Sequence, residues 1–185
     1  MCSIRTAESV CAGHPDKLAD QIADQILDDI LYDDKAARVA VEVMAAGRRI
    51  IVTGEITTNH RPRIRESVRT ALARAGYSPL GILIYVWTRR QSSDINAGVT
   101  TSLEARGGDS SAFALQGAGD QGTVYGYATA ETPERLPLPL VLAHRICERL
   151  DTAQVEGTIC GIKSDGKAQV LSLIHISEPT RPLYI

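Results

Sequence analysis

Apolar residues spaced three and four apart between Pro15 and Leu31 constrain the fold more than any other feature of the sequence. This spacing places their side chains on one stripe of an amphipathic helix, which must pack against another apolar layer. The stripe comprises Leu18, Ile22, Ile26 and Ile30, together with Leu27 and Leu31. Two β-rich runs, RVAVEVM and IIVTGEITT, lie on either side of the turn Ala45 to Arg49 and predict an antiparallel hairpin as that layer. In the first run the valines share one face, and Glu42 points to the other.

The same kinds of element continue after the hairpin. Helical spacing returns from Arg63 to Gly76, and ILIYVW predicts another strand. Helix, hairpin, helix and strand together predict an α+β fold with helices packed on one face of mixed or antiparallel sheets. Further along, TVYGYATA predicts a strand, LVLAHRICERL a helix and KAQVLSLI the start of another strand, which indicates a second unit similar to the first. The helix of this second unit is expected to pack through Leu140, Ala143, Ile146, Cys147 and Leu150.

Composition excludes several classes of partner. The 185 residues include 20 basic and 22 acidic side chains, so the net charge of -2 creates no field that would attract nucleic acid or an anionic membrane. The cysteines show no C-x-x-C spacing and the histidines no H-x-x-x-H spacing, so there is no zinc signature. No signal-peptide-like apolar region precedes Pro15, and the most apolar stretch, Leu80 to Trp87, is too short to cross a bilayer. These features predict a cytoplasmic protein that holds any polyanion by local groups.

The segment GHPDK stands at the start of the long amphipathic helix. Unpaired backbone N–H groups and the positive end of the helix dipole favour an anion such as phosphate there. His14 and Lys17 can add donors, and Asp16 offers a carboxylate oxygen for a magnesium ion bound to that phosphate. Helix initiation explains the same residues without any ligand, so the segment alone leaves both interpretations open.

The segment GAGDQG, from Gly117 to Gly122, matches the dinucleotide fingerprint G-x-G-x-x-G. That fingerprint works only when the glycines open a helix, whereas the residues after Gly122 predict a strand. A Rossmann oxidoreductase therefore requires a helix after Gly122. The remaining interpretations are a plain glycine turn, or a turn that brings Asp120 and Gln121 close to a ligand.

Other polar residues are ambiguous when each is taken by itself. Glu42 and Glu55 lie within β-rich runs, where most glutamates simply face water. Gln91 and Asp94 open a stretch of low periodicity that extends to Gly122, and loops of that length are usually functional or disordered. The segment SDGK, ending at Lys167, resembles a β-turn whose lysine can pair with phosphate or face solvent. No phosphate-loop motif and no G-x-S-x-G elbow occurs, which excludes the corresponding NTPase and hydrolase classes.

Taken in order, these motifs resemble the S-adenosylmethionine synthetase family, also called methionine adenosyltransferases. The matching segments are ESVCAGHPDKLADQI, VEV with GEITT, QSSDINAGV, GAGDQG with GYAT, LAHR, and DGKAQV. They run from about Glu8 to Val170, and GHPDK, GEITT and GAGDQG together are specific to the family.

The resemblance implies a site for each substrate. Family members join ATP and L-methionine to form S-adenosylmethionine and release phosphate and diphosphate, using Mg²⁺ and K⁺. By position, the resemblance implies ATP contacts, methionine contacts, a magnesium ligand, a potassium ligand and catalytic residues. These are, for ATP, His14, Asp165, Gly166 and Lys167; for methionine, Glu55, Gln91 and Asp120; for magnesium, Asp16; for potassium, Glu42; and for catalysis, His14, Lys17 and Asp120.

The resemblance also implies a domain organisation and an assembly. Residues 1–108 are expected to form an N-terminal α+β domain, in which about 91–108 correspond to the family's gating loop. Residues 109–170 are expected to form part of the central domain. In this family the site lies between subunits, so the parent protein is expected to be a homodimer or a dimer of dimers. Family chains are longer and bring further cationic residues to the triphosphate, so these 185 residues alone are expected to be inactive.

The sequence departs from the family in three places. Ser93 stands where the family commonly has proline before the aspartate, and Lys163-Ser164 replaces a common Arg-Pro. After Val170 the string LSLIHISEPTR looks like the translation of a transposase-type sequencing adapter. We therefore interpret 171–185 as a non-native read-through tail, the alternative being a strand from Leu171 to Ile176. A further alternative for the whole chain is a non-catalytic nucleotide-binding or regulatory protein that retains the fold.

Overall fold

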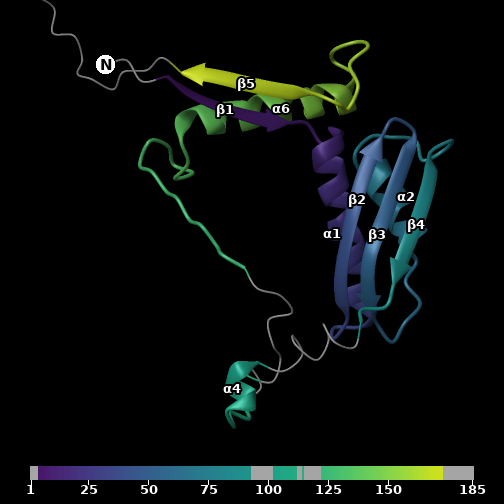
Figure 1. Cartoon of the computed structure of the whole chain (residues 1–185). Helices are drawn as coiled ribbons and strands as arrows, with labels where there is room; N and C mark the ends of the chain where they lie inside the picture. The colour runs from purple at the N-terminus through teal and green to yellow at the C-terminus, as the bar shows by residue number, and fades with distance from the viewer. Residues whose placement is uncertain (1–3, 93–101, 112–113, 115–121, 173–185) are drawn as a thin grey trace, which may run out of the picture. The chain divides into compact units, whose positions relative to one another are not determined.

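The predicted helix and hairpin form the first part of the structure. The computed structural model describes residues 4–92, 102–111, 114 and 122–172, which group into two compact units (Figure 1). The larger unit runs from Pro15 to Gly126. In it, helix α1 spans Pro15–Asp33, and strand β2 (Arg38–Ala46) pairs antiparallel with β3 (Arg49–Thr57). Both elements were predicted from the periodicity, and both are confirmed.

A second helix and a third strand complete the larger unit. Helix α2 (Ile64–Arg74) connects β3 to strand β4 (Leu83–Arg89), which pairs parallel to β3. The strand order is therefore β2-β3-β4, a mixed sheet in which β3 is central. Both helices lie behind this sheet in the view of Figure 1. The structure thus confirms the predicted α+β fold with helices on one sheet face.

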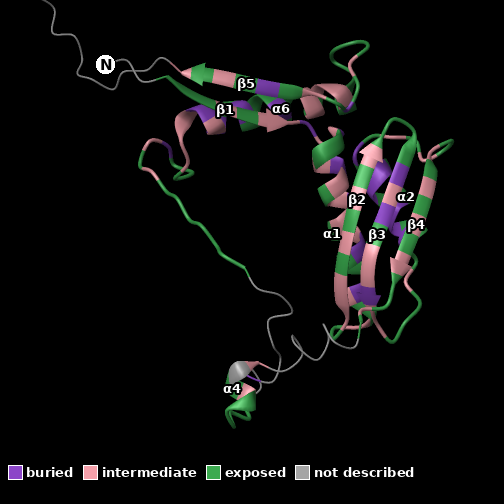
Figure 2. Cartoon of the chain, viewed as in Figure 1, coloured by how far each residue is buried: buried purple, intermediate pink, exposed green. Residues whose placement is uncertain are grey.

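The core of the larger unit lies between the sheet and its two helices. Ile50, Val52 and Ile56 of β3 are buried against the apolar stripes of α1 and α2 (Figure 2). Four of the six residues expected on the stripe of α1, Leu18, Ile22, Ile26 and Ile30, are buried. Leu31 is half-buried, and Leu27, at the edge of the stripe, is 36% exposed, so its assignment to the buried face is wrong. Among the described residues, no helix covers the opposite face of the sheet. Because side chains alternate along a strand, this open face carries Met44 of β2 with Tyr85 and Trp87 of β4, all exposed.

The smaller unit combines the first residues of the chain with the last part described. It comprises Met1–His14 together with Tyr127–Ile185. Strand β1 (Arg5–Val10) pairs antiparallel with strand β5 (Lys167–Ser172), and helix α6 (Leu138–Glu156) packs on both. The helix and the start of β5 were predicted, whereas β1 was not. The predicted domain boundaries stay a prediction, but the structure adds that β1 packs with the C-terminal elements.

One prediction about α6 is wrong. Ala143 and Cys147 are buried as expected, together with Pro139 and Val141, but Ile146 is 45% exposed. In the described part of the chain this sheet has two strands, which cover a narrow stripe of the helix, so residues at the edge of the predicted apolar face remain in solvent.

The strand predicted for TVYGYATA is absent. Residues 122–129 adopt no regular secondary structure, and Val124 and Tyr125 are 96% and 90% exposed. Their β-branched and aromatic residues favour a strand only when a neighbouring strand offers a ladder and a surface, and in the described part of the chain none pairs with them. No helix follows Gly122 either, which excludes the Rossmann interpretation. Within the predicted long loop, the described residues include one short helix, α4 (Leu103–Arg106).

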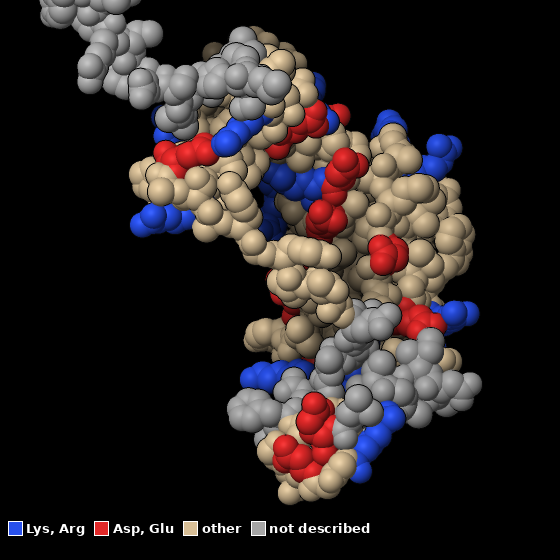
Figure 3. All heavy atoms as spheres, turned by 60° about the vertical axis from the view of Figure 1, so that its left-hand side comes forward, with Lys and Arg blue, Asp and Glu red and all other residues tan. Residues whose placement is uncertain are grey.

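Two further features of the described residues are the distribution of charge on one face and the apolar content of the helices. Acidic and basic side chains are interspersed on the face drawn in Figure 3, without a continuous patch of one sign. Among the described residues, no helix has the length and apolar content that crossing a membrane requires.

Candidate functional site

The two segments of the predicted nucleotide site lie side by side in the smaller unit. Because β1 and β5 are antiparallel and Val10 pairs with Lys167, the residues after β1 face those before β5. The backbone N–H of Cys11 donates to the carbonyl oxygen of Gly166 at 2.8 Å, and that of Gly13 to Ser164 at 3.0 Å. The structure therefore brings the loop that ends at His14 against the SDGK turn, from opposite ends of the described chain.

Two glycines allow this close approach. A Cβ added to Gly13 would lie 2.8 Å from the carbonyl carbon and oxygen of Ser164. A Cβ added to Gly166 would lie 2.8 Å from the sulfur of Cys11. Real Cβ contacts are almost never this short, so the glycines of the GHPDK and SDGK motifs serve packing as well as any ligand.

Asp151 of α6 holds the same loop from the side. Both oxygens of its carboxylate accept the Ala12 N–H, at 3.1 and 3.2 Å. The neighbouring Cys11 is buried, and its thiol donates to the carbonyl oxygen of Cys147 at 3.8 Å. Burial raises the pKa of the Cys11 thiol to about 12, and the Asp151 carboxylate adds to the increase. Cys11 is therefore a neutral packing group near neutral pH and not a nucleophile.

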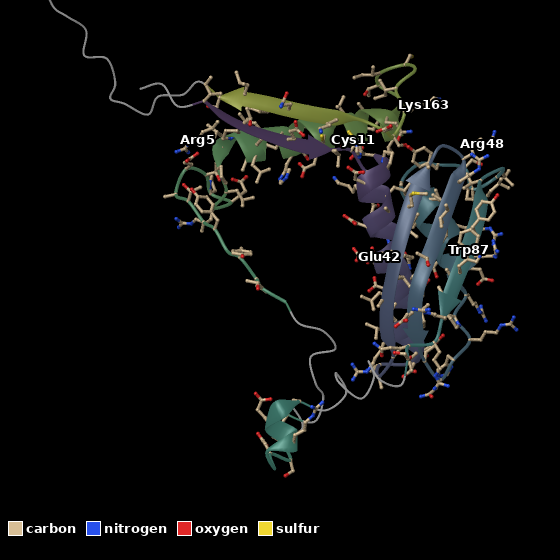
Figure 4. The ribbon with its side chains drawn as sticks, viewed as in Figure 1. Arg5, Cys11, Glu42, Arg48, Trp87 and Lys163 are labelled. Atoms are coloured by element: carbon tan, nitrogen blue, oxygen red, sulfur yellow. The ribbon has the colours of Figure 1, made fainter. Side chains whose placement is uncertain are left out.

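The charged side chains of the turn are accessible, whereas Ser164 is buried. Asp165 and Lys167 are exposed, and His14 is half-buried. The ammonium of Lys167 lies 2.5 Å from the Glu8 carboxylate, which also accepts a hydrogen bond from Gln169. Figure 4 shows Cys11 and Lys163 at the end of this unit where the loop and the turn meet. A phosphate could therefore take Lys167 as a donor only by sharing or replacing Glu8.

The predicted magnesium and potassium ligands lie in the larger unit. Asp16 and Lys17 belong to the first turn of α1, and Glu42 is exposed near the middle of β2. Carboxylate oxygens suit hard cations such as Mg²⁺ and K⁺. Among the described residues, no group of three or more histidines, cysteines or acidic residues could hold a metal ion. Either cation would therefore need oxygen donors from a substrate, from water or from residues outside that part, which is how Mg²⁺ is commonly held with phosphates.

Two of the three predicted methionine residues, Glu55 and Gln91, lie near one end of the sheet in the larger unit. Glu55 is on β3, and its position pairs with Arg89, the last residue of β4. Gln91 follows two residues later, and its amide oxygen is buried with no hydrogen-bond partner among the described residues. Glu42 pairs with Thr53, so it shares the open sheet face with Glu55 at a diagonal position. The structure thus brings Glu42 and Glu55 to one face of the sheet, and Gln91 follows the end of the strand that pairs with Glu55. Glu42 and Trp87 are labelled on the sheet in Figure 4.

The glycine before Glu55 has a local role in the sheet. Gly54 has a φ of 130°, and a Cβ there would lie 2.9 Å from the Cα of Val41 on β2. Only glycine adopts this backbone conformation easily. The residue pair Gly54-Glu55 therefore lets β2 approach β3 closely while the Glu55 side chain remains on the open face.

Part of the predicted site lies outside the described residues. Asp94 and Asp120 are among them, as is the GAGDQG segment up to Gln121. Most of the predicted tail, 173–185, also lies outside, whereas Leu171 and Ser172 belong to β5. The roles expected for these residues stay predictions.

Sequence reasoning missed two polar residues that the structure places at these sites. Arg89 pairs with Glu55, and a strand assignment extended by two residues would have placed it opposite that glutamate. No local signal could have indicated that Asp151 binds the backbone at Ala12, because the contact joins residues far apart in the chain.

The sequence matches two models of one protein family. Residues 3–94 match "S-adenosylmethionine synthetase, N-terminal domain", and 115–181 match "S-adenosylmethionine synthetase, central domain". The second match extends past Val170 to residue 181, into the segment interpreted above as a tail.

Curated relatives carry the corresponding name. The S-adenosylmethionine synthase of Kosmotoga olearia is 46% identical over 181 residues, which cover 94% of this chain and 46% of the relative. S-adenosylmethionine synthase 1 of Frankia casuarinae is 44% identical over 186 residues, covering 95% and 46%. The synthase of Nocardia farcinica is 43% identical with the same coverage. The chain therefore spans about half the length of the curated relatives it matches.

Proposed function

The chain belongs to the S-adenosylmethionine synthetase family, and we propose that it provides substrate-binding segments for the synthesis of S-adenosylmethionine from ATP and L-methionine. The observation that carries this proposal is the pair of backbone hydrogen bonds between the loop ending at His14 and the SDGK turn. They bring together the two segments assigned to ATP by their motifs.

In the proposed reaction the methionine sulfur attacks the ribose C5′ of ATP. A carbon–sulfur bond forms, the C5′–oxygen bond breaks, and the triphosphate leaves with the bonding electrons before its hydrolysis to diphosphate and phosphate. Because the leaving group gains negative charge, donors held in place around it lower the barrier. His14, Lys17 and Lys167 are the cationic or N–H donors proposed for this role, with Asp165 and Gly166 contacting the nucleotide. Asp120 is proposed as a further catalytic residue near the methionine.

The proposed cations and the amino acid use the residues of the larger unit. Asp16 is proposed to bind Mg²⁺ and Glu42 to bind K⁺, and bound cations would compensate the charge of the phosphates. Glu55, Gln91 and Asp120 are proposed to bind methionine. The clustering of Glu55 and Gln91 at one end of the sheet supports this assignment.

A second copy of the chain is the proposed partner. The open face of the β2-β3-β4 sheet exposes Met44, Leu83, Tyr85 and Trp87, with the rings of Tyr85 and Trp87 stacked 5.9 Å apart. Contiguous apolar surface of this kind is typical of an interface. It supports a homodimer, or a dimer of dimers, of the longer protein. The cytoplasm is the proposed location, as the family resemblance implies.

ATP binding by the 185-residue polypeptide tests the proposal directly. Titration calorimetry with Mg²⁺ and ATP should show that Lys167→Ala and His14→Ala each weaken binding about tenfold, as expected for the loss of one charge-assisted hydrogen bond. Lys163→Ala is the matched control, because it removes the same charge from the exposed start of the turn and should change the affinity less than about twofold. Equal affinities for all four proteins would contradict the proposed nucleotide site.

The same polypeptide is expected to form no measurable S-adenosylmethionine from ATP and methionine. It spans 46% of the length of its relatives, and a triphosphate without further cationic groups would retain unpaired charge. The alternative function, a non-catalytic nucleotide-binding protein, would bind ATP without a site for methionine. Binding of methionine near Trp87 distinguishes the two.

A further inference from the structure

We propose that Arg89 binds the α-carboxylate of the amino-acid substrate while Glu55 binds its α-ammonium, so that the two residues hold the substrate as a zwitterion. The inference rests on the proposed function, which supplies the amino acid. It assigns to Arg89 a role in substrate selection that the motifs of the sequence do not indicate.

The two charges are held opposite each other at the end of the sheet. Glu55 and Arg89 occupy paired positions of the parallel strands β3 and β4, so their side chains leave the sheet on the same face. The Nε of Arg89 lies 3.0 Å from Oε1 of Glu55. The Glu55 side chain is only 18% exposed, whereas that of Arg89 is 83% exposed. Glu55 is therefore the fixed member at the sheet, and Arg89 extends into solvent.

Both groups retain bonding capacity after they pair. A guanidinium carries five N–H donors in a planar fork, and the bond to Glu55 uses only the one on Nε. Among the described residues, no other acceptor bonds the two terminal nitrogens of Arg89, and none donates to Oε2 of Glu55. A free carboxylate fits the terminal nitrogens in a bidentate pair, and an ammonium fits the remaining glutamate oxygen.

Gln91, two residues beyond the end of β4, adds a third polar group. Its amide oxygen is buried and has no hydrogen-bond partner in the described part of the chain. A buried acceptor without a donor is unfavourable unless a ligand or water satisfies it. An ammonium between Glu55 and Gln91 would supply donors for both, while Arg89 would balance the charge of the substrate carboxylate.

The larger unit contains its own reporter for this site. Trp87 is the single tryptophan of the chain, and it lies two residues before Arg89 on the same face of β4. Its emission should therefore respond when a ligand binds at Glu55 and Arg89. An exposed ion pair contributes little to stability, so replacing Arg89 is expected to leave the fold intact.

The test is a tryptophan-fluorescence titration of the 185-residue polypeptide with three ligands: L-methionine, L-methioninol, which lacks the carboxylate, and 4-(methylthio)butanoate, which lacks the ammonium. The unchanged protein should bind L-methionine about tenfold or more tightly than either analogue, as expected for one lost charge-assisted contact. Arg89→Ala should bind methionine and methioninol with about equal affinity, because the contact with the methionine carboxylate is the one that it loses. Arg89→Lys should restore part of the preference, since it keeps the charge but not the fork.

Arg90→Ala is the matched control, because it removes an adjacent, exposed arginine and should retain the tenfold preference. Arg89→Gln removes the charge but keeps a polar side chain, so it should lose the preference in the same way as Arg89→Ala. An unchanged near-ultraviolet circular dichroism spectrum of each variant shows that the loss comes from the contact and not from the fold. If Arg89→Ala keeps the preference for methionine over methioninol, the role of Arg89 is wrong while the methionine site stands. If the unchanged protein binds none of the three ligands, both the proposed methionine site and the role of Arg89 are overturned.

Discussion

The two units of this chain both pack helices on a small sheet, but different interactions hold them together. The larger unit has a continuous core of twelve buried residues drawn from α1, β3, α2 and the turn after it. The smaller unit has a buried cluster of three, Cys11, Cys147 and Ala168. Its loops are held instead by backbone hydrogen bonds, by the Asp151 carboxylate and by exposed ion pairs. Burial therefore stabilises the larger unit, whereas specific polar contacts position the segments of the smaller one.

This difference corresponds to the proposed binding sites: methionine residues in the larger unit, and the loop and turn proposed for ATP in the smaller one. Glu55, Arg89 and Gln91 stand on a sheet whose other face is fixed by the apolar core. His14 and the SDGK turn depend on close backbone contacts at two glycines. Substitutions should therefore affect the two sites by different mechanisms and with different magnitudes.

The largest effect is expected in the core of the larger unit. Leu72 is 1% exposed, and Leu72→Ala should destabilise this unit by about 2–5 kcal/mol through lost burial and a residual cavity. Urea unfolding followed by Trp87 emission measures it. Leu150→Ala, in the smaller unit, should leave that transition within about 0.5 kcal/mol of the unchanged protein. If Leu150→Ala shifts it as much as Leu72→Ala does, the units do not unfold independently and the comparison fails.

A smaller effect is expected where the two loops meet. Gly166→Val would drive a side chain into the sulfur of Cys11 and should destabilise the smaller unit by about 1–3 kcal/mol through overpacking. Hydrogen exchange at the amides of Cys11 and Gly13 should become faster in that variant. Gly126→Val is the control, because no atom lies near its added Cβ. Unchanged protection in Gly166→Val would show that the loop and the turn are not held by this contact.

The smallest effect is a difference in acid sensitivity between the units. The Leu138 N–H lowers the pKa of Glu131 below its usual range, with help from Arg5. The Asn59 N–H and the Thr58 hydroxyl lower the pKa of Asp34 below its usual range. A lowered folded-state pKa contributes stability that is present above the unfolded value and is lost as the pH falls through the folded value.

Glu131→Gln should therefore reduce the loss of stability between neutral pH and acid in the smaller unit only, and Asp34→Asn in the larger unit only. Hydrogen exchange in each unit, followed from about pH 3 to about pH 7, measures this pH dependence of stability. The assignment of each carboxylate to its own unit is contradicted if either variant changes both profiles equally.

The sequence predicted the larger unit more completely than the smaller one. The apolar spacing of α1, α2 and the hairpin is local, so the residues that define each element are close together in the chain. Strand β1 was not predicted, because its partner β5 lies at the other end of the described chain. The TVYGYATA segment was predicted as a strand on propensity, which does not create a strand where no neighbour pairs with it.

The candidate sites show the same limit. The motifs by themselves indicated the family and the residue types at His14, Glu55, Gln91 and Lys167, because motif spacing is a property of the chain. Only the tertiary structure decided that the His14 loop contacts the SDGK turn, that Asp151 binds that loop, and that Arg89 pairs with Glu55. Local spacing determines which face of a helix or strand is apolar, whereas contacts between distant segments depend on how strands pair and which backbones can approach.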